Sequence, residues 1–124
     1  FRFINASGSV NTGNNYAYAV RNMLSSNSLS ISPSTANNFL WIGMITDQRT
    51  DGSTSGVCYI YNPYDASKYT FVNSQATGMN SSEKRFSKGM GVYQVAERVR
   101  GFQIYESNSS RAFINGRISV YGVK

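Results

Sequence analysis

Alternation of large and small side chains at a spacing of two recurs along this chain and limits the folds open to it. Tyr16, Tyr18 and Val20 show the pattern most clearly, and runs of Asn, Ser and Gly separate such segments. In a strand, successive side chains lie on opposite faces, so residues two apart share one face. On a helix, apolar residues that share a face are three or four apart. No amphipathic helix of useful length is found in the sequence. The pattern therefore predicts an all-β protein of short strands joined by turns.

The alternating runs predict about eight or nine short strands in an antiparallel β-sandwich, jelly-roll-like, with little or no helix. The most apolar run, Phe39–Ile45, is expected to be a central strand covered on both sides, with Trp41 in the core. Asn73–Ser87 is expected to be a long polar connection. Turns are expected at Asn62–Pro63 and Asn115–Gly116. The expected strands are Phe1–Phe3, Tyr16–Arg21, Phe39–Ile45, Val57–Tyr61, Lys68–Val72, Met90–Val95, Val99–Tyr105 and Arg117–Val123.

Length and composition predict one folded domain, residues 1–124. A chain of 124 residues is short enough for a single core, and the 14% of aromatic residues excludes a disordered chain. Charged residues make up only 15%, and 19 Ser, 13 Asn and 11 Gly supply much of the remaining polarity and the turns. No apolar run approaches the roughly 18–20 residues of a membrane-spanning helix, so no membrane partner is expected.

The residues that carry most enzyme chemistry are missing. Histidine is absent and Cys58 is the single cysteine, which excludes His-dependent catalysis, His or multi-Cys metal sites and an intrachain disulfide. Ser81 and Lys84 have the spacing of a Ser/Lys dyad but lack its helix and partner motifs. Asp47 and Asp51 precede a glycine, but a basic residue stands where a calcium loop needs an oxygen donor. We therefore expect no enzyme activity, no catalytic residues, no metal and no cofactor.

The net charge of +6 comes entirely from the last third of the chain. Residues 1–83 contain four basic and four acidic residues, whereas residues 84–124 contain eight basic and two acidic ones. An anionic partner such as nucleic acid would explain this excess, and so would a solvated basic surface. The second explanation is favoured because the basic residues are dispersed. The tightest pair is Arg98 and Arg100, which are expected on one face of a strand.

Tyrosines gather around the turn at Asn62–Pro63. Two interpretations are open: the rings pack as cross-strand pairs on one sheet face, or they form a surface for a sugar or a protein. Together with the two arginines they are the candidate ligand or interface residues. These candidates are Tyr59, Tyr61, Tyr64, Tyr69, Arg98 and Arg100.

Eight residues near the end of the chain have a characteristic order and spacing. The series is Phe113, Gly116, Ile118, Val120, Tyr121, Gly122, Val123 and Lys124. It resembles the ending of a family of tailed-phage virion proteins, F-x-x-G-x-[IF]-x-[LV]-Y-G-[IV]-K. Two further parts of the chain are similar to that family, Arg2–Gly8 with Asn15–Tyr18 near the start and Ile60–Pro63 with Lys68–Thr70 in the middle.

The resemblance implies a non-enzymatic virion β-sandwich domain of a tail fibre, a tail tip or a capsid-surface knob, assembled in the host cytoplasm. The implied partners are other virion proteins and further copies of the chain, with a trimer as one arrangement. Distal members of such assemblies bind a host-surface glycan or protein. Members of the family usually begin with one or two further strands, so the resemblance also implies that this chain is the C-terminal part of a longer protein.

Three other functions stay open on the sequence. A carbohydrate-binding, lectin-like module would use the tyrosines as its platform. A nucleic-acid-binding domain would use the basic C-terminal third, although dispersed charges make it the less expected choice. A glycan-degrading enzyme would use loop carboxylates, with Asp47 and Asp51 as the first candidates.

Overall fold

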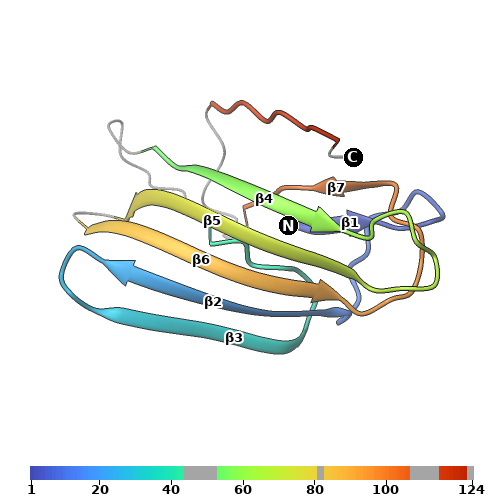
Figure 1. The fold of residues 1–124 in the computed structure, drawn as a ribbon, viewed down its shortest axis with the longest axis horizontal. Helices are drawn as coiled ribbons and strands as arrows, with labels where there is room; N and C mark the ends of the chain where they lie inside the picture. The colour runs from blue at the N-terminus through green and yellow to red at the C-terminus, as the bar shows by residue number, and fades with distance from the viewer. Residues whose placement is uncertain (44–52, 81–82, 107–114, 123–124) are drawn as a thin grey trace.

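The computed structural model describes residues 1–43, 53–80, 83–106 and 115–122. These residues form strands and no helix, which confirms the predicted all-β class. Within the described ranges, no helix is long and apolar enough to cross a membrane. The strands are β1 (Arg2–Ile4), β2 (Tyr16–Leu24), β3 (Leu29–Asn37), β4 (Ser55–Tyr61), β5 (Thr70–Asn80), β6 (Glu83–Tyr93) and β7 (Gly101–Gln103), shown in Figure 1.

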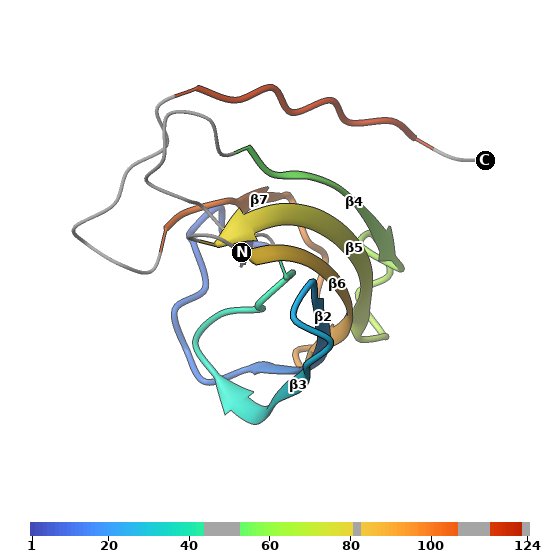
Figure 2. The same ribbon diagram turned by 90° about the vertical axis from the view of Figure 1, so that its left-hand side faces the viewer.

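The strands form two antiparallel sheets. The larger sheet has five strands in the order β3-β2-β6-β5-β4, and β1 pairs with β7 in a second sheet of two strands. Figure 2 shows that the large sheet is strongly curved and that β1 and β7 lie on its concave side. We call the side of the large sheet that faces β1 and β7 the inner face, and the opposite side the outer face.

Aromatic side chains join the two sheets. Phe3 of β1 packs against Tyr16 of β2 and Tyr93 of β6, with ring centroids 6.4 Å and 5.5 Å away, and the two tyrosine rings are 5.1 Å apart. All three residues are fully buried. Removal of large aromatic surfaces from water is the main stabilising contribution to a core of this kind. Phe1, Leu40, Ile42 and Val72 complete the buried cluster.

The hydroxyl groups of these buried tyrosines hold the chain between β1 and β2 in place. Tyr16 accepts a hydrogen bond from the Phe3 amide (2.9 Å) and donates one to the Asn11 carbonyl (3.2 Å). Tyr93 accepts one from the Asn11 side-chain amide (2.7 Å) and donates one to the Glu97 carboxylate. Burial raises the pKa of Tyr93, so its hydroxyl stays neutral and can donate to Glu97.

The prediction of a central strand at Phe39–Ile45 is wrong for its described part. Phe39–Gly43 belongs to no strand and lies on the inner face, with Leu40 and Ile42 buried and Trp41 half-buried. Glycine in β6 makes room for this segment, since a Cβ at Gly91 would lie 2.4 Å from the Leu40 Cδ2 atom. The run is apolar because the inner face covers it, and not because it pairs within a sheet.

The predicted polar connection at Asn73–Ser87 is also wrong. Most of it forms β5 and the start of β6. The inward-facing residues there are small, with Ser74, Ala76 and Ser87 buried, so large apolar side chains do not mark the alternation. β3 was not predicted at all. Its Pro33 suggests a break, but an edge strand tolerates proline because one side of it forms no ladder.

Of the two C-terminal strand predictions, one is confirmed over a shorter range and the other is wrong. Val99–Tyr105 contains β7, which is shorter than expected. Arg117–Val123 is wrong for its described part, because residues 117–122 belong to no strand and have no pairing partner in the described chain. Phe113 and Ile114, which would flank the expected turn at Asn115–Gly116, lie outside the described residues.

Candidate interaction surface

The outer face of the large sheet is the most unusual surface of the described chain. The strand registers place side chains in rows across it. One row contains Pro33 of β3, Ala19 of β2, Met90 of β6, Asn73 of β5 and Tyr59 of β4. Because side chains alternate along each strand, the rows two residues before and after also point outward. The outer face therefore has a regular arrangement that follows from the strand pairing.

Large apolar side chains dominate these rows. Eight of them are between 43% and 68% exposed. With roughly 200 Å² for each side chain, they expose on the order of 800 Å² of mainly apolar surface. The largest apolar patch of a typical monomer is about 300–600 Å². The eight residues are Met23, Leu29, Ile31, Val57, Tyr59, Tyr61, Phe71 and Met90.

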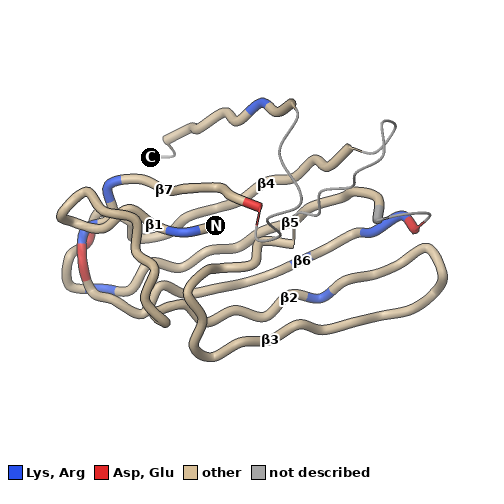
Figure 3. The backbone as a smooth tube through the Cα atoms, turned by 180° about the vertical axis from the view of Figure 1, so that it is seen from behind, with Lys and Arg blue, Asp and Glu red and all other residues tan. Residues whose placement is uncertain are grey.

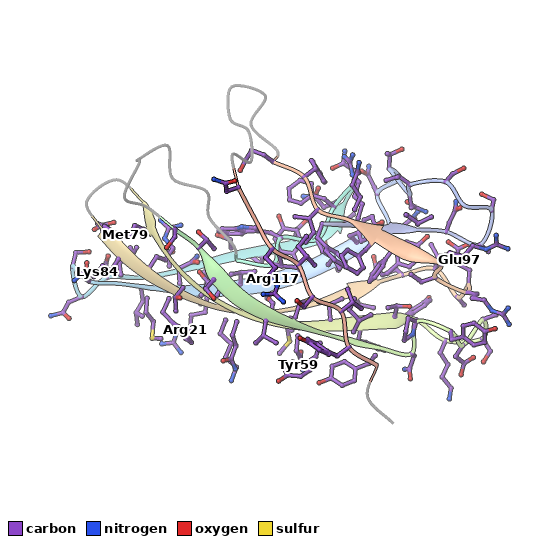
Figure 4. All side chains as sticks on the ribbon, turned by 90° about the horizontal axis from the view of Figure 1, so that it is seen from above. Arg21, Tyr59, Met79, Lys84, Glu97 and Arg117 are labelled. Carbon is purple, nitrogen blue, oxygen red and sulfur yellow. The ribbon has the colours of Figure 1, made fainter. Side chains whose placement is uncertain are left out.

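Two positive charges interrupt the apolar rows of the outer face. Arg21 of β2 and Lys88 of β6 are direct cross-strand partners. No described residue supplies an acidic side chain on this face, and like charges directly opposite one another are unfavourable. Figure 4 shows Arg21 on the same side of the sheet as Tyr59. Elsewhere, charged residues gather mainly at the ends of the strands, as Figure 3 shows.

In β3 the apolar side chains point to the outer face and the serines point to the inner face, which is the reverse of the usual arrangement. Leu29 and Ile31 point to the outer face and are 58% and 68% exposed. Ser30 and Ser32 point to the inner face, where the Asn22 side-chain amide donates a hydrogen bond to the Ser30 hydroxyl (3.3 Å). A half-buried strand normally directs its apolar residues inward. The apolar residues of β3 therefore contribute little to the core and are available for contact with a partner.

The four candidate tyrosines are all exposed, and they divide into two locations. Tyr59 and Tyr61 lie on the outer face, where Tyr61 is the cross-strand partner of Phe71. Tyr64 lies in the turn after β4, and Tyr69 directly precedes β5. The structure thus places two of the four on the outer face and two at its end.

The structure joins Arg98 to Tyr64. Asn62 has a positive φ of 57°, and the Val99 amide donates a hydrogen bond to the Pro63 carbonyl (2.7 Å), which brings the turn after β4 beside the segment before β7. The Arg98 guanidinium lies 3.9 Å from the centre of the Tyr64 ring, in cation–π geometry.

The expected strand-face pairing of Arg98 with Arg100 is wrong, because both residues precede β7 and lie in no strand. The Arg100 amide instead donates a hydrogen bond to the Ile4 carbonyl (2.9 Å).

The titratable groups of the described residues offer no site for a metal ion. Among the described residues, no group of three or more Cys, Asp or Glu side chains could hold a metal ion. Burial raises the pKa of Cys58 to about 11, so the thiol is protonated near neutral pH. An open hollow at the start of β4 is lined by neutral residues, including Ser55, Val57 and Phe86. The sequence candidates Asp47, Asp51 and Ser81 lie outside the described residues.

Most residues of the outer face were not singled out from the sequence. The signal that could have found them is the alternation of Leu29, Ile31 and Pro33 with serines, which already marks an amphipathic strand. The same pattern does not reveal which side of the strand faces the protein. Comparisons with protein-family models, with curated proteins and with solved structures gave no match for this chain.

Proposed function

We propose that this chain is a non-enzymatic structural domain of a phage virion and that its outer face is a surface for assembly. The reversed polarity of β3 is the observation that carries the proposal. β3 turns Leu29 and Ile31 to the outer face and Ser30 and Ser32 to the inner face, where Ser30 is itself exposed, so the strand exposes apolar surface that adds nothing to the core. Packing against a neighbouring subunit removes that surface from water.

Size and composition of the outer face support an assembly role. The roughly 800 Å² of exposed large apolar side chains matches what one partner contributes to an interface of standard size, about 800 Å². Tyrosine and methionine are enriched in interface cores, and charged residues are depleted there. From the row that contains Ala17 to the row that contains Met23, only Arg21 and Lys88 carry charge among the outward-facing residues.

The assignment to a virion depends on the resemblance of the C-terminal residues to tailed-phage proteins. An assembly surface is what a virion domain needs, since such domains contact copies of themselves and other virion proteins. On this proposal the chain is located in the tail or on the capsid surface. The outer face does not distinguish these two locations.

Sedimentation velocity of the purified chain tests the assembly role. We expect association that increases with protein concentration, and Met90→Lys should weaken it because the substitution places a charge at the centre of the outer face. Met90 is 66% exposed, so the variant should keep the stability of the original chain. Ser26→Lys, in the exposed turn between β2 and β3, adds the same charge elsewhere and should associate normally. Monomers at every concentration, or equal effects of both substitutions, would refute an assembly surface on the outer face.

Salt dependence separates this proposal from nucleic-acid binding. Sulfate strengthens apolar association, and screening weakens the repulsion among Arg21 and Lys88 of adjoining copies. Association should therefore increase with salt. Nucleic-acid binding would show the opposite, a steep loss of affinity as salt replaces phosphate contacts.

Glycan binding is a second candidate, favoured by one observation. Tyr59 and Tyr61 expose their rings on the same face at a spacing of two, next to Phe71. Neighbouring exposed aromatic rings can stack on sugar rings. Binding on a glycan array that Tyr59→Ala abolishes would support a lectin-like role, and an array without signal would leave assembly as the function of these residues.

A further inference from the structure

The described C-terminal residues 115–122 form an exposed segment that belongs to no strand of the described chain. Every one of them is exposed, and Ile118, Val120 and Tyr121 are 64%, 74% and 81% exposed. None of them pairs in a sheet or makes a backbone hydrogen bond with another described residue. Figures 1 and 2 show the segment beyond β4, the last strand of the large sheet. Its apolar side chains and backbone groups are thus available to a partner.

The free edge of β4 is suited to receive such a segment. Among the described strands, β4 pairs only with β5, so its other edge is open. Ser55–Tyr61 contains no charged residue and no proline, which are the usual features that protect an edge from strand addition. The opposite edge of the sheet is protected, because β3 contains Pro33 and pairs with β2 through an irregular register.

Length and side-chain pattern of the segment match this edge. Residues 117–122 provide six residues against the seven of β4. Cys58 and Ile60 of β4 point inward and are only half-buried, although both pack against the buried cluster. Ile118 and Val120 have the same spacing of two, so as an adjacent strand they would extend the inner face and cover Cys58 and Ile60.

We propose that residues 117–122 of one copy add to the free edge of β4 in a second copy as the sixth strand of its large sheet. Each copy has one such segment and one such edge. In a mutual exchange between two copies, or in a closed ring, every segment therefore pairs with a β4 edge. This inference depends on the backbone edge of β4 and on the C-terminal segment, and not on the outward-facing side chains, and it goes beyond the proposed function.

Cysteine cross-linking of the full chain tests the pairing in a Cys58→Ser background, because the buried thiol of Cys58 reacts slowly. Tyr59→Cys places an exposed thiol on the outer side of β4 in all variants. In the added strand, Ser119→Cys and Tyr121→Cys place a second thiol on that same side. Ile118→Cys is the matched control, since its side chain points to the other side. After treatment with a short bismaleimide, we expect covalent dimers joined between position 59 and the second cysteine from the first two variants and little or none from the third. A mixture of tagged and untagged copies should give mixed dimers.

Three results would overturn the inference. Equal cross-linking of all three variants would indicate random collision, and cross-links confined to single chains would show that the segment returns to its own β4. Absence of any cross-link, with the fold retained by circular dichroism, would show that the segment does not reach the edge. Removal of residues 115–124 provides an independent measurement, and it should abolish dimers that depend on the segment. Met90→Lys should leave the cross-links intact, so failure of the outer-face proposal can be recognised separately.

Discussion

The contact between Gly91 and Leu40 gives a quantitative test of how the apolar segment 39–43 is held on the inner face. A Cβ added at Gly91 would lie 2.4 Å from the Leu40 Cδ2 atom and 3.2 Å from the Ala17 carbonyl oxygen. The first distance is too short for any real contact, so Gly91→Ala must displace Leu40. Overpacking of this kind costs about 1–3 kcal/mol. The lower chain entropy of alanine in the unfolded state offsets roughly 0.5–1 kcal/mol of it.

The same contact predicts that a second substitution rescues the first. Leu40→Ala alone should destabilise the fold by about 2–5 kcal/mol, because Leu40 is buried and its removal leaves a cavity. In that background the methyl group of Gly91→Ala enters the vacated space. The double variant should then be more stable than the sum of the single effects by about 2 kcal/mol, a coupling typical of residues in direct contact.

Urea unfolding measured by far-ultraviolet circular dichroism gives the free energies of unfolding of the original chain, the two single variants and the double variant. Circular dichroism is preferable to tryptophan fluorescence, since Trp41 is adjacent to Leu40 in the chain. Gly101→Ala in β7 is the control, because its added Cβ would meet only the Ile4 side chain at 3.3 Å and should not couple to Leu40→Ala. Additive effects of Gly91→Ala and Leu40→Ala, within about 0.5 kcal/mol, would contradict the packing of residues 39–43 described above.

Three further predictions concern buried polar groups. Tyr93→Phe should destabilise the fold by about 1–3 kcal/mol in urea unfolding, because it removes the hydroxyl that bonds to both Asn11 Nδ2 and Glu97 Oε1, whereas Tyr18→Phe removes only one long hydrogen bond and should cost less. Iodoacetamide should alkylate Cys58 of the folded chain at pH 8 about 100-fold more slowly than in urea, since burial raises the pKa of the thiol from 9.0 to about 11; equal rates would contradict its burial. The raised pKa means that the folded state holds the Cys58 proton more tightly, so this contribution to stability is complete below pH 9 and is lost as the pH rises from 9 to 11. Burial raises the pKa of Tyr93 as well, so the free energy of unfolding should decrease above pH 9, and a curve that stays flat to pH 11 would contradict both shifts.

Strands with large inward residues could be predicted from the sequence, and strands with small ones could not. Tyr16 and Val20 identify β2 because their alternation in size coincides with their alternation in burial. In β5, Ser74 and Ala76 are buried on the inner face although both side chains are small. Their burial depends on tertiary contacts between distant parts of the chain, which a local pattern does not contain.

The candidate surface was predicted in part. Tyr59 and Tyr61 were identified as ligand or interface candidates because they gather around a turn, with packing on a sheet face as the alternative, and both are exposed in the structure. Met90 and Ile31 are more exposed than these two tyrosines. They were not predicted to be surface residues because an apolar residue in a strand is normally assigned to the core. Only the register, which pairs Arg21 with both Lys88 and Ile31, shows that these residues share one face.

The distribution of side chains over the two faces explains why the fold leaves two surfaces open at once. The aromatic core occupies the end of the inner face where β1 and β7 pack. Toward the other end of the strands, Asn22, Ser30 and Ser87 occupy one row of the inner face and are linked by hydrogen bonds. A sheet half-lined with small polar residues gains less from its own core than one lined with leucine or valine. Large apolar residues instead lie where the described part of the chain leaves them exposed, on the outer face and in the C-terminal segment around Ile118. Burial of both surfaces by neighbouring copies would therefore add stability that the single chain lacks, so the thermal midpoint should increase with protein concentration, and less so after removal of residues 115–124.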